Sequence, residues 1–505
     1  MSFASLLFQF LTPEFMLADT ALLVLLAGLF KSTAQKRGML LSLTLLGGII
    51  AAAMLVLHPH YGNLSNGMVV GDPLTQLVKL TLLTLSLITA IFAAGSTVRE
   101  HFAEYLGLIL FSTIGMMLLA GTEDLLMIFI GLEMTSIPLY ILTGYLKRSS
   151  ASAEAALKYF LVGGVSAAFL LFGLSLIYGV TGSTSLADLA RTPRAALLDP
   201  LLLAGVVMAM VGFGFKVAAV PFHLWAPDVY EGAPTPSAAL IASGSKVAGF
   251  LILAKLLTIG FAKGTGSAAW GLFQPGWLPL LAIAGAASVV VGNLAALSQS
   301  NVKRILAYSA IAQSGYMLLG LMATGTTGIS SVIFYVIVYA LTTLGAFGVV
   351  SLVEQRRGGS QLHHFQGLHQ SAPGLALCMG VFMVSLAGIP PLAGFFGKFY
   401  LFAGALGSVS SLYDGNLGLL WLIIVAVAFN AVSLYYYLIV LKHIFVIPTG
   451  AEPAQPSPRC ATSVFVGFLA LAVFALGLYP AALLEPIQNA VTSAATFAAK
   501  TAALH

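Results

Sequence analysis

Five ionisable side chains lie inside apolar stretches of the sequence: Glu133, Lys158, Lys216, Lys246 and Lys398. Only 8% of the 505 residues are charged, so these positions differ sharply from the chain around them. A charged side chain at the centre of a membrane helix costs about 2.5–3.5 kcal/mol, and such residues commonly serve ion transport or buried ion pairs. Carboxylates and amines exchange protons readily. The set therefore predicts a pathway for ions, with protons as the species carried.

Glu133 is the one carboxylate near the middle of an apolar run, because Asp19 and Asp124 lie nearer to the ends of theirs. Burial disfavours the ammonium form of a lysine, and a nearby carboxylate restores it. A lysine held between these two influences can take up and release a proton when its partner moves. The alternatives are a permanent ion pair or an ammonium group that reaches the lipid headgroups. We expect this last behaviour of Lys79 and Lys255.

The composition indicates a membrane protein. Hydrophobic residues make up 59% of the chain, and the mean hydropathy is +0.99. A soluble domain needs more charge on its surface. The net charge of +5 and the pI near 9.0 do not indicate a nucleic-acid partner, because membrane proteins concentrate lysine and arginine in cytoplasmic loops. We expect one multi-pass domain in a lipid bilayer.

The cysteine and histidine residues give no sign of a redox centre. Cys378 and Cys460 are too far apart in sequence for a CxxC metal site. The nine histidines fall in loops or at the ends of apolar runs, whereas a haem-carrying membrane subunit needs histidines inside its spans. We therefore expect no cofactor and no metal in this chain.

Apolar runs of about 20 residues predict fourteen membrane-spanning helices. The first basic residue, Lys31, follows the first run. We therefore expect that run to be retained as a span rather than removed as a signal peptide. The predicted cores are 15–31, 38–57, 75–95, 104–120, 124–145, 155–180, 200–220, 236–260, 278–298, 302–323, 328–353, 374–402, 417–441 and 462–484.

The distribution of basic residues predicts the orientation of these spans. The loops after odd-numbered spans contain twelve lysine and arginine residues, and the loops after even-numbered spans contain three. Cytoplasmic loops carry the excess of positive charge. The odd-numbered loops are therefore predicted to be cytoplasmic, and both termini are predicted to lie on the outer, periplasmic side.

Prolines interrupt two of the predicted spans, at Pro221 and at Pro390-Pro391. Proline removes a backbone donor and clashes with the preceding turn. Irregular backbone at membrane depth is tolerated where it is buried in protein or lines a water-filled cavity. A lysine lies near each interruption, Lys216 before the first and Lys398 after the second.

The spacing of these features hints at a duplicated architecture. Glu133 and Lys216 are 83 positions apart, while Gln313 and Lys398 are 85 positions apart. Interrupted helices at corresponding positions of two halves are typical of inverted transporter repeats.

Three stretches of the sequence resemble the antiporter-type membrane subunits of respiratory complex I. They are GLEMTSIPLYIL at 131–142, PFHLWAPDVYEGAPTPSAALIASGSKVAGF at 221–250 and SNVKRILAYSAIAQSGYM at 300–317. The DVYEGAPTP portion resembles the N subunits of bacterial NADH:quinone oxidoreductase, homologues of mitochondrial NADH dehydrogenase subunit 2, rather than the sister L and M subunits. The likeness spans roughly 100–440.

The resemblance implies an all-α polytopic membrane protein with about 14 transmembrane helices, two inverted five-helix repeats, and discontinuous helices 7 and 12. It assigns 1–103 to helices 1–3 and 104–260 to the first repeat, helices 4–8. It assigns 278–441 to the second repeat, helices 9–13, and 442–505 to helix 14 and a tail.

The resemblance also implies a role for each candidate residue. Glu133 and Lys216 match the family's glutamate–lysine pair, and Lys158, Lys246 and Lys398 match the lysines of a central hydrophilic axis. The subunit would move protons along this axis in the bacterial inner membrane. Quinone, FMN and iron–sulfur clusters would be bound by other subunits, and the partners would be neighbouring antiporter-like and small membrane subunits.

Two other functions stay open at this point. One is a subunit of a multisubunit Na⁺/H⁺ antiporter, which the DVYEGAPTP stretch disfavours. The other is a purely structural membrane subunit, in which the internal charges would be dispensable.

Overall fold

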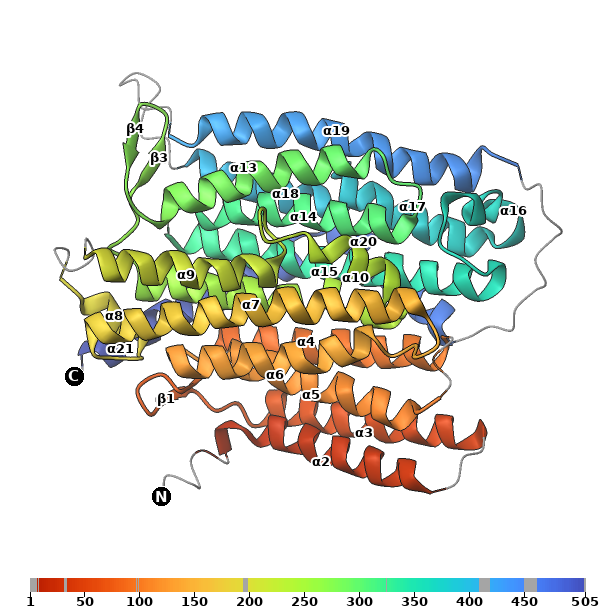
Figure 1. Cartoon of the computed structure of the whole chain (residues 1–505), viewed down its shortest axis with the longest axis horizontal. Helices are drawn as coiled ribbons and strands as arrows, with labels where there is room; N and C mark the ends of the chain where they lie inside the picture. The colour runs from red at the N-terminus through yellow and green to blue at the C-terminus, as the bar shows by residue number, and fades with distance from the viewer. Residues whose placement is uncertain are drawn as a thin grey trace.

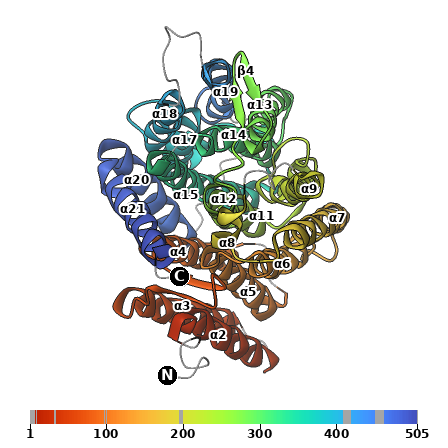
Figure 2. The ribbon, with the colours of Figure 1, turned by 90° about the vertical axis from the view of Figure 1, so that its left-hand side faces the viewer.

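A computed structural model of the chain describes residues 7, 9–30, 34–96, 98, 100–193, 199–323, 325–407, 418–448 and 461–503. Its long helices run side by side along one axis, and two short β-hairpins lie towards one end of them (Figure 1). Viewed along that axis, the helices form a bundle with α11 and α12 near its centre (Figure 2).

The first part of the chain forms helices up to the centre of the bundle. These are α2 (Thr12–Leu29), α3 (Ala34–Leu57), α4 (Pro73–Ala94), α5 (Phe102–Ala120), α6 (Leu125–Thr143), α7 (Ser150–Thr181), α8 (Leu186–Arg191), α9 (Pro200–Val217), α10 (Trp225–Gly232), α11 (Thr235–Ala242) and α12 (Gly244–Lys255), which continues into a π-helical turn, Leu256–Gly260.

The remaining helices follow from residue 277 onwards. They are α13 (Trp277–Ala296), α14 (Val302–Leu321), α15 (Gly325–Arg357), a 3₁₀ turn (Leu362–Phe365), α16 (Leu368–Ser371), α17 (Pro373–Ala387), α18 (Ala393–Leu406), α19 (Leu420–Phe445), α20 (Ala461–Leu478) and α21 (Ala481–Ala503). The antiparallel hairpins pair β1 (Gly62–Leu64) with β2 (Val69–Gly71) and β3 (Ser267–Ala269) with β4 (Leu272–Gln274).

The structure confirms a helical, multi-pass membrane fold. In the described part of the chain, twelve helices are long and apolar enough to cross a membrane. The other two predicted cores fall on α14, which is more polar, and on the shorter apolar pair α17 and α18. The predicted core 462–484 runs past the end of α20 at Leu478, and α21 is a further helix that the sequence did not predict.

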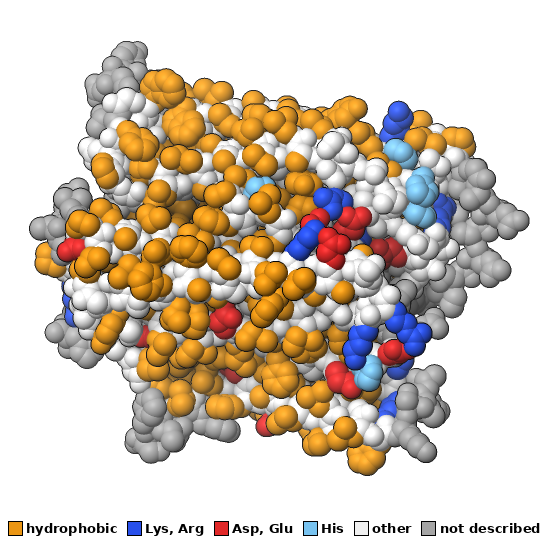
Figure 3. Space-filling view, viewed as in Figure 1, with side chains coloured by type: hydrophobic (Ala, Val, Ile, Leu, Met, Phe, Trp, Pro, Cys, Tyr) orange, Lys and Arg blue, Asp and Glu red, His pale blue; other side chains and the backbone are white. Residues whose placement is uncertain are grey.

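The centre of the bundle is formed by α11, α12 and α15. Every residue of the apolar window within Thr235–Gly260 is buried, and nearly all of that within Gly325–Arg357 is buried. The outer helices instead leave apolar side chains exposed over much of the surface (Figure 3). A helix buried on all sides places its polar residues among other helices, so lysines on α12 must find partners inside the protein.

Side-chain caps fix where several helices begin. Asp124 accepts hydrogen bonds from the amides of Leu126 and Met127 at the start of α6. Asn301 accepts one from the Lys303 amide at the start of α14. Such caps satisfy amides that have no partner within the helix. Asp124 is therefore a structural carboxylate, in agreement with its predicted place near the end of a span.

Three of the predicted spans are interrupted. Two of these interruptions were predicted: α9 ends at Val217 before Pro221, and α17 ends at Ala387 before Pro390. The third lies at Ser243, whose backbone (φ −108°, ψ −80°) separates α11 from α12 within the predicted core 236–260. No proline marks this position, and this interruption was not predicted.

Candidate functional site

Lys216 on α9 binds α6, the helix that carries Glu133, through Ser136. Glu133 is half-buried on α6, and Lys216 is buried near the end of α9. The Lys216 Nζ donates a hydrogen bond to Ser136 Oγ at 3.0 Å. Ser136 lies one helical turn after Glu133, so the two side chains share a face of α6. Between these described residues no ion pair forms within 4.0 Å, and the serine is the direct partner.

The Val217 carbonyl, just beyond Lys216, accepts a hydrogen bond from α14 and not from its own helix. Within a continuous helix the Val217 carbonyl would accept from the amide of residue 221, but Pro221 has no N–H. Ser314 on α14 donates to this carbonyl instead, with an Oγ–O distance of 2.6 Å. The first interruption thus contacts α14 through Ser314.

Lys246 lies three residues after the interruption at Ser243 and is buried. Its Nζ donates to the Ala310 carbonyl at 2.5 Å and to Ser314 Oγ at 2.7 Å. It also lies 5.4 Å from the centre of the Tyr339 ring, within range of a cation–π contact. Ser314 therefore accepts from Lys246 while it donates to the backbone beside Lys216.

Lys398 repeats this arrangement at the second interruption. The Leu386 carbonyl would pair with residue 390 in a continuous helix, and Pro390 again has no N–H. Lys398 Nζ donates to this carbonyl at 2.7 Å and to Asn430 Oδ1 at 2.5 Å. Its Nζ lies 5.1 Å from the centre of the Tyr316 ring.

Gln313 connects the second interruption to α14. Its Nε2 donates to the Leu386 carbonyl, which Lys398 also binds, at 3.2 Å. Its Oε1 accepts from the Tyr335 hydroxyl. Gln313 and Ser314 are adjacent on α14, so this helix contacts both interruptions. We call the following set the buried lysine line: Glu133, Ser136, Lys216, Ser314, Lys246, Gln313, Lys398 and Asn430.

Neutral groups hold all three lysines of this line. Within the described residues, no carboxylate lies within 4.0 Å of the Nζ of Lys216, Lys246 or Lys398. A carbonyl or hydroxyl oxygen stabilises an ammonium less than a carboxylate does, because it carries no full charge. These lysines can therefore change protonation state without breaking a buried ion pair.

Lys158 lies apart from the buried lysine line, at the surface. Its side chain is 44% exposed and pairs with Glu154 at 2.7 Å and Asp228 at 2.6 Å. Arg304 also pairs with Asp228, and with Glu231. These five residues form the surface charge cluster, a compact group of acidic and basic side chains that borders a large apolar area of this face (Figure 3).

The prediction that Lys79 and Lys255 reach the lipid headgroups is wrong. Both side chains are buried. Lys79 Nζ lies 2.6 Å from Glu14, and Lys255 Nζ lies 3.6 Å from Glu123. Lys255 also donates to the Ala120 carbonyl at 3.0 Å. A lysine near the end of a span can equally well turn inwards when a neighbouring helix offers a carboxylate or a carbonyl.

Three members of the buried lysine line were missed from the sequence: Ser136, Ser314 and Asn430. Each is a polar residue in an apolar span, which is a weak signal because serine often bonds only its own helix. No group of three or more metal-ligating side chains occurs among the residues that the structure describes.

Residues 122–429 match the family described as NADH:quinone oxidoreductase/Mrp antiporter, TM. The chain is also 46% identical over 449 residues to NADH-quinone oxidoreductase subunit N 2 of Acidobacterium capsulatum. That alignment covers 87% of this chain and 89% of the relative. The five candidate residues predicted from the sequence fall within the matched family segment, and Asn430 lies one position beyond it.

Solved structures of membrane complexes share this fold. A chain of respiratory complex I from Thermus thermophilus with bound aureothin is 35% identical, with a TM-score of 0.77 and coverage of 94% of this chain and 98% of that one. A chain of the Mrp complex from Dietzia sp. gives a TM-score of 0.81 at 23% identity, with 96% of each chain covered. The second likeness concerns the fold alone.

Proposed function

Because the chain belongs to the family of NADH-quinone oxidoreductase N subunits, we propose that it carries protons across the membrane along the buried lysine line. The redox chemistry takes place in other subunits, which hold FMN, iron–sulfur clusters and the quinone. This chain contributes the groups that bind and release protons.

The main support for this proposal comes from the two backbone carbonyls that Pro221 and Pro390 leave without a helical amide donor. Val217 and Leu386 each offer an acceptor at an interruption, and each is contacted by a residue of α14. Hydrogen bonds thus form three buried groups. Lys216 binds Ser136, Ser314 binds Lys246 and the Val217 carbonyl, and Lys398 binds Asn430 and the Leu386 carbonyl. The backbones of α9 and α14 place these groups next to one another along the chain. A structural ion pair would need none of this, since it would place a carboxylate beside each lysine.

Glu133 is the group that can change the charge balance of the line. It is the only carboxylate of the set, and it lies one helical turn before Ser136, whose hydroxyl binds Lys216. Moving one charge through the membrane potential costs about 2.3 kcal/mol per 100 mV. Shifting the Glu133 charge towards or away from Lys216 alters their interaction by a comparable amount at an effective dielectric constant near 20.

Lys158 has a different place in the proposal, at a contact with a neighbouring membrane subunit. A charge cluster exposed at the border of an apolar area is unfavourable against lipid. The neighbouring antiporter-like and small membrane subunits of the complex are the partners that would cover it. We infer that the surface charge cluster links this line to the adjacent subunit.

The same proposal includes the location and internal symmetry of the chain. The basic-residue distribution supports a bacterial inner membrane protein with both termini on the periplasmic side. The matching proline-freed carbonyls support two inverted repeats over 104–260 and 278–441, with helices 1–3 in 1–103 and helix 14 with its tail in 442–505.

Proton pumping by the assembled complex tests the function. Glu133→Gln and Lys216→Met should each lower NADH-driven proton uptake into inverted membrane vesicles by about tenfold or more, the loss expected when a group that stabilises a transferred charge is removed. Lys263→Met, in an exposed loop, is the control. Normal pumping by both variants, at a normal amount of assembled complex, would overturn the proposal.

A Na⁺/H⁺ antiporter subunit is the second candidate, supported by the fold shared with the Mrp complex. The 46% identity to an N subunit favours the first. Sodium-driven proton movement that persists when NADH oxidation is blocked would instead favour the antiporter.

A further inference from the structure

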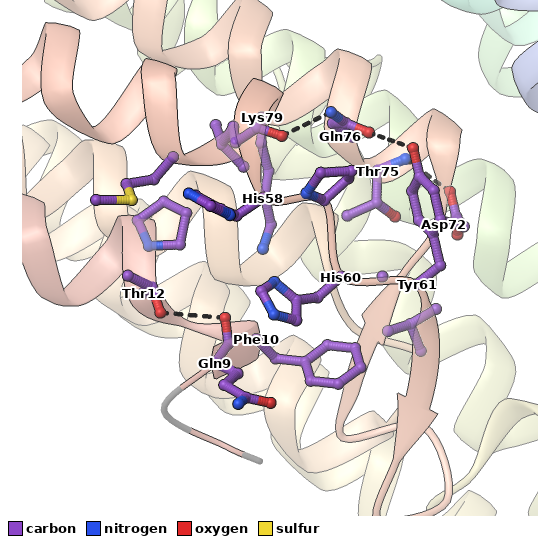
Figure 4. A pocket seen from close by; sticks show the side chains of 16 residues that line it. Gln9, Phe10, Thr12, His58, His60, Tyr61, Asp72, Thr75, Gln76 and Lys79 are labelled. Atoms are coloured by element: carbon purple, nitrogen blue, oxygen red, sulfur yellow. Dashed lines mark hydrogen bonds between the residues drawn. The ribbon is translucent and has the colours of Figure 1, made fainter. Parts of the chain in front are cut away.

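Two cavities open at the end of the bundle that the basic-residue distribution places outside. The small vestibule has a volume of about 200 Å³ and is lined by His58, His60, Thr75 and Lys79, among others (Figure 4). The large vestibule has a volume of about 780 Å³, and Glu123 and Lys255 form part of its wall. Cavities of this size with charged walls hold water.

The Glu123–Lys255 pair lies at the boundary between the large vestibule and the protein interior. Lys255 is 6% exposed at its side chain and Glu123 is 14% exposed, with 3.6 Å between Nζ and Oε1. Lys255 Nζ donates to the Ala120 carbonyl at 3.0 Å and to Thr75 Oγ1 at 3.3 Å. One side of the pair is thus held by protein groups, and the other faces the cavity.

The backbone fixes Glu123 firmly in this position. Its amide donates to the Gly67 carbonyl at 2.8 Å, and its own carbonyl accepts from the Leu186 amide at 2.9 Å. Gly67 has φ +99°, and a Cβ there would lie 2.9 Å from the Glu123 carbonyl oxygen. The turn of the first hairpin therefore needs glycine to approach Glu123 this closely.

A second lysine–carboxylate pair lies directly beside the first. Lys79 pairs with Glu14 at 2.6 Å, and its Nζ packs against Gly121, next to the Ala120 carbonyl that binds Lys255. Thr75 lines the small vestibule and accepts from Lys255. Val70 and Asp72, just before α4, line both vestibules, so the two cavities are neighbours, and each has a buried lysine in its wall.

We propose that the Glu123–Lys255 pair is the outer port of this subunit, at which protons exchange between the external water and the buried lysine line. The inference rests on the proposed function and adds a route to it. The large vestibule supplies water on one side of the pair, and α12 connects the other side to the interior.

The geometry selects protons over metal cations. A sodium ion at this site would take the oxygens of Ala120, Thr75 and Glu123 as ligands. Lys255 Nζ already occupies the position among these oxygens. An ammonium beside a carboxylate can pass on a proton through water, and it repels a bare cation.

Helix α12 joins the port to the line. It carries Lys246 and Lys255 nine residues apart, a rise of about 13–14 Å. Between them, Gly249 packs on the stem of Lys216, where a Cβ would meet Lys216 Cγ at 3.3 Å. The helix begins at the Ser243 interruption and ends in a π-helical turn, and π-helical turns are frequent at functional sites.

The test uses the assembled complex in native membranes. The double variant Glu123→Gln with Lys255→Gln keeps polar side chains and removes both charges. We expect the complex to assemble and NADH-driven pumping to fall by about tenfold, the loss that follows removal of a charged hydrogen-bond partner. Pumping equal to that of the Lys263→Met control would overturn the inference, because a pair with only a structural role tolerates neutral replacements.

A labelling experiment covers the case in which the double variant fails to assemble. Thr258 lines the large vestibule and is half-buried, whereas Leu471 on α20 is an exposed apolar residue. Thr258→Cys and Leu471→Cys are each made in a chain carrying Cys378→Ser and Cys460→Ser. Spheroplasts are treated with a cationic, membrane-impermeant thiol reagent, and pumping is then measured in inverted vesicles.

Thr258→Cys should react from the outside and its pumping should then fall to half or less, while Leu471→Cys should not react. Failure of Thr258→Cys to react in spheroplasts, or full pumping after reaction, would overturn the port. If Glu133→Gln and Lys216→Met lose pumping while the variants of Glu123, Lys255 and Thr258 pump normally, only the inference of an outer port is refuted. Normal pumping in the Glu133 and Lys216 variants would remove the proposed function itself.

Discussion

Replacing Ser314 by alanine tests the buried lysine line at its centre. The Lys246 Nζ bonds to the Ala310 carbonyl at 2.5 Å and to Ser314 Oγ at 2.7 Å. Ser314→Ala removes the second bond and keeps the first. It also takes away the donor that the Val217 carbonyl receives at 2.6 Å, and Pro221 cannot replace that donor.

The size of the effect follows from these two losses. A hydrogen bond to a charged group contributes about 1.5–3 kcal/mol, and a buried carbonyl left without a donor costs about 1–3 kcal/mol. Each 1.36 kcal/mol is a tenfold change in rate or equilibrium. The lower ends of the two ranges add up to about 2.5 kcal/mol. If half of this loss raises the barrier of the proton-transfer step, pumping slows by about tenfold. The fold should tolerate the change, because alanine fits wherever serine did.

The assay is NADH-driven acidification of inverted vesicles, normalised to the assembled complex on a native gel. Ser330→Ala is the matched control, since Ser330 is also buried and its hydroxyl donates at 2.7 Å to Thr326 of its own helix. It should pump normally. Pumping by Ser314→Ala within twofold of the control would refute the reasoning, because protons would then pass without the bridge between Lys246 and the first interruption.

Two further substitutions probe the second interruption. Asn430→Ala removes the acceptor 2.5 Å from Lys398 Nζ but leaves the backbone carbonyl at 2.7 Å, so pumping should fall less than in Lys398→Met, by about three- to tenfold. Gly477→Ala on α20 should lower the thermal stability of the detergent-solubilised complex, because its Cβ would lie 2.1 Å from the Pro391 carbonyl oxygen and such overpacking costs about 1–3 kcal/mol. Gly467→Ala on the same helix, where a Cβ meets nothing within 4 Å, should leave the melting temperature unchanged; equal melting of the two variants would contradict the second prediction.

The sequence was enough to predict the spans and two of the three interruptions. Apolar length and proline are local properties, and each acts on the backbone where it occurs. The interruption at Ser243 has no such local cause. It lies in a fully buried segment, where contacts with surrounding helices decide the backbone conformation. The α21 helix was missed because its alanine- and threonine-rich sequence is only weakly apolar.

The lysines show the same division between local and tertiary information. Burial of Lys216, Lys246 and Lys398 could be predicted from the apolar residues on either side, but the same reasoning did not foresee the exposed position of Lys158. The inward direction of Lys79 and Lys255 could not be predicted. The local sequence around a lysine near the end of a span is the same whether its side chain points to lipid headgroups or to a neighbouring helix. The position of the carboxylate partner determines the direction of the lysine side chain, and the partners Glu14 and Glu123 lie far from these lysines in sequence.

The role of the prolines links the fold to the proposed chemistry. A continuous helix uses every interior carbonyl for its own amides, so it has few acceptors to offer a buried lysine. Pro221 and Pro390 each leave one carbonyl free four residues earlier, at Val217 and Leu386. These oxygens are neutral, fixed by the helix that precedes them, and unable to take a proton. They accept a hydrogen bond from an ammonium or a hydroxyl group. A carboxylate in the same place would be negatively charged and would keep the lysine protonated. At the second interruption the freed Leu386 carbonyl binds Lys398 directly, whereas at the first the Val217 carbonyl binds Ser314, which accepts from Lys246. In both cases the buried lysine has only neutral partners, so it can exchange its proton without breaking an ion pair.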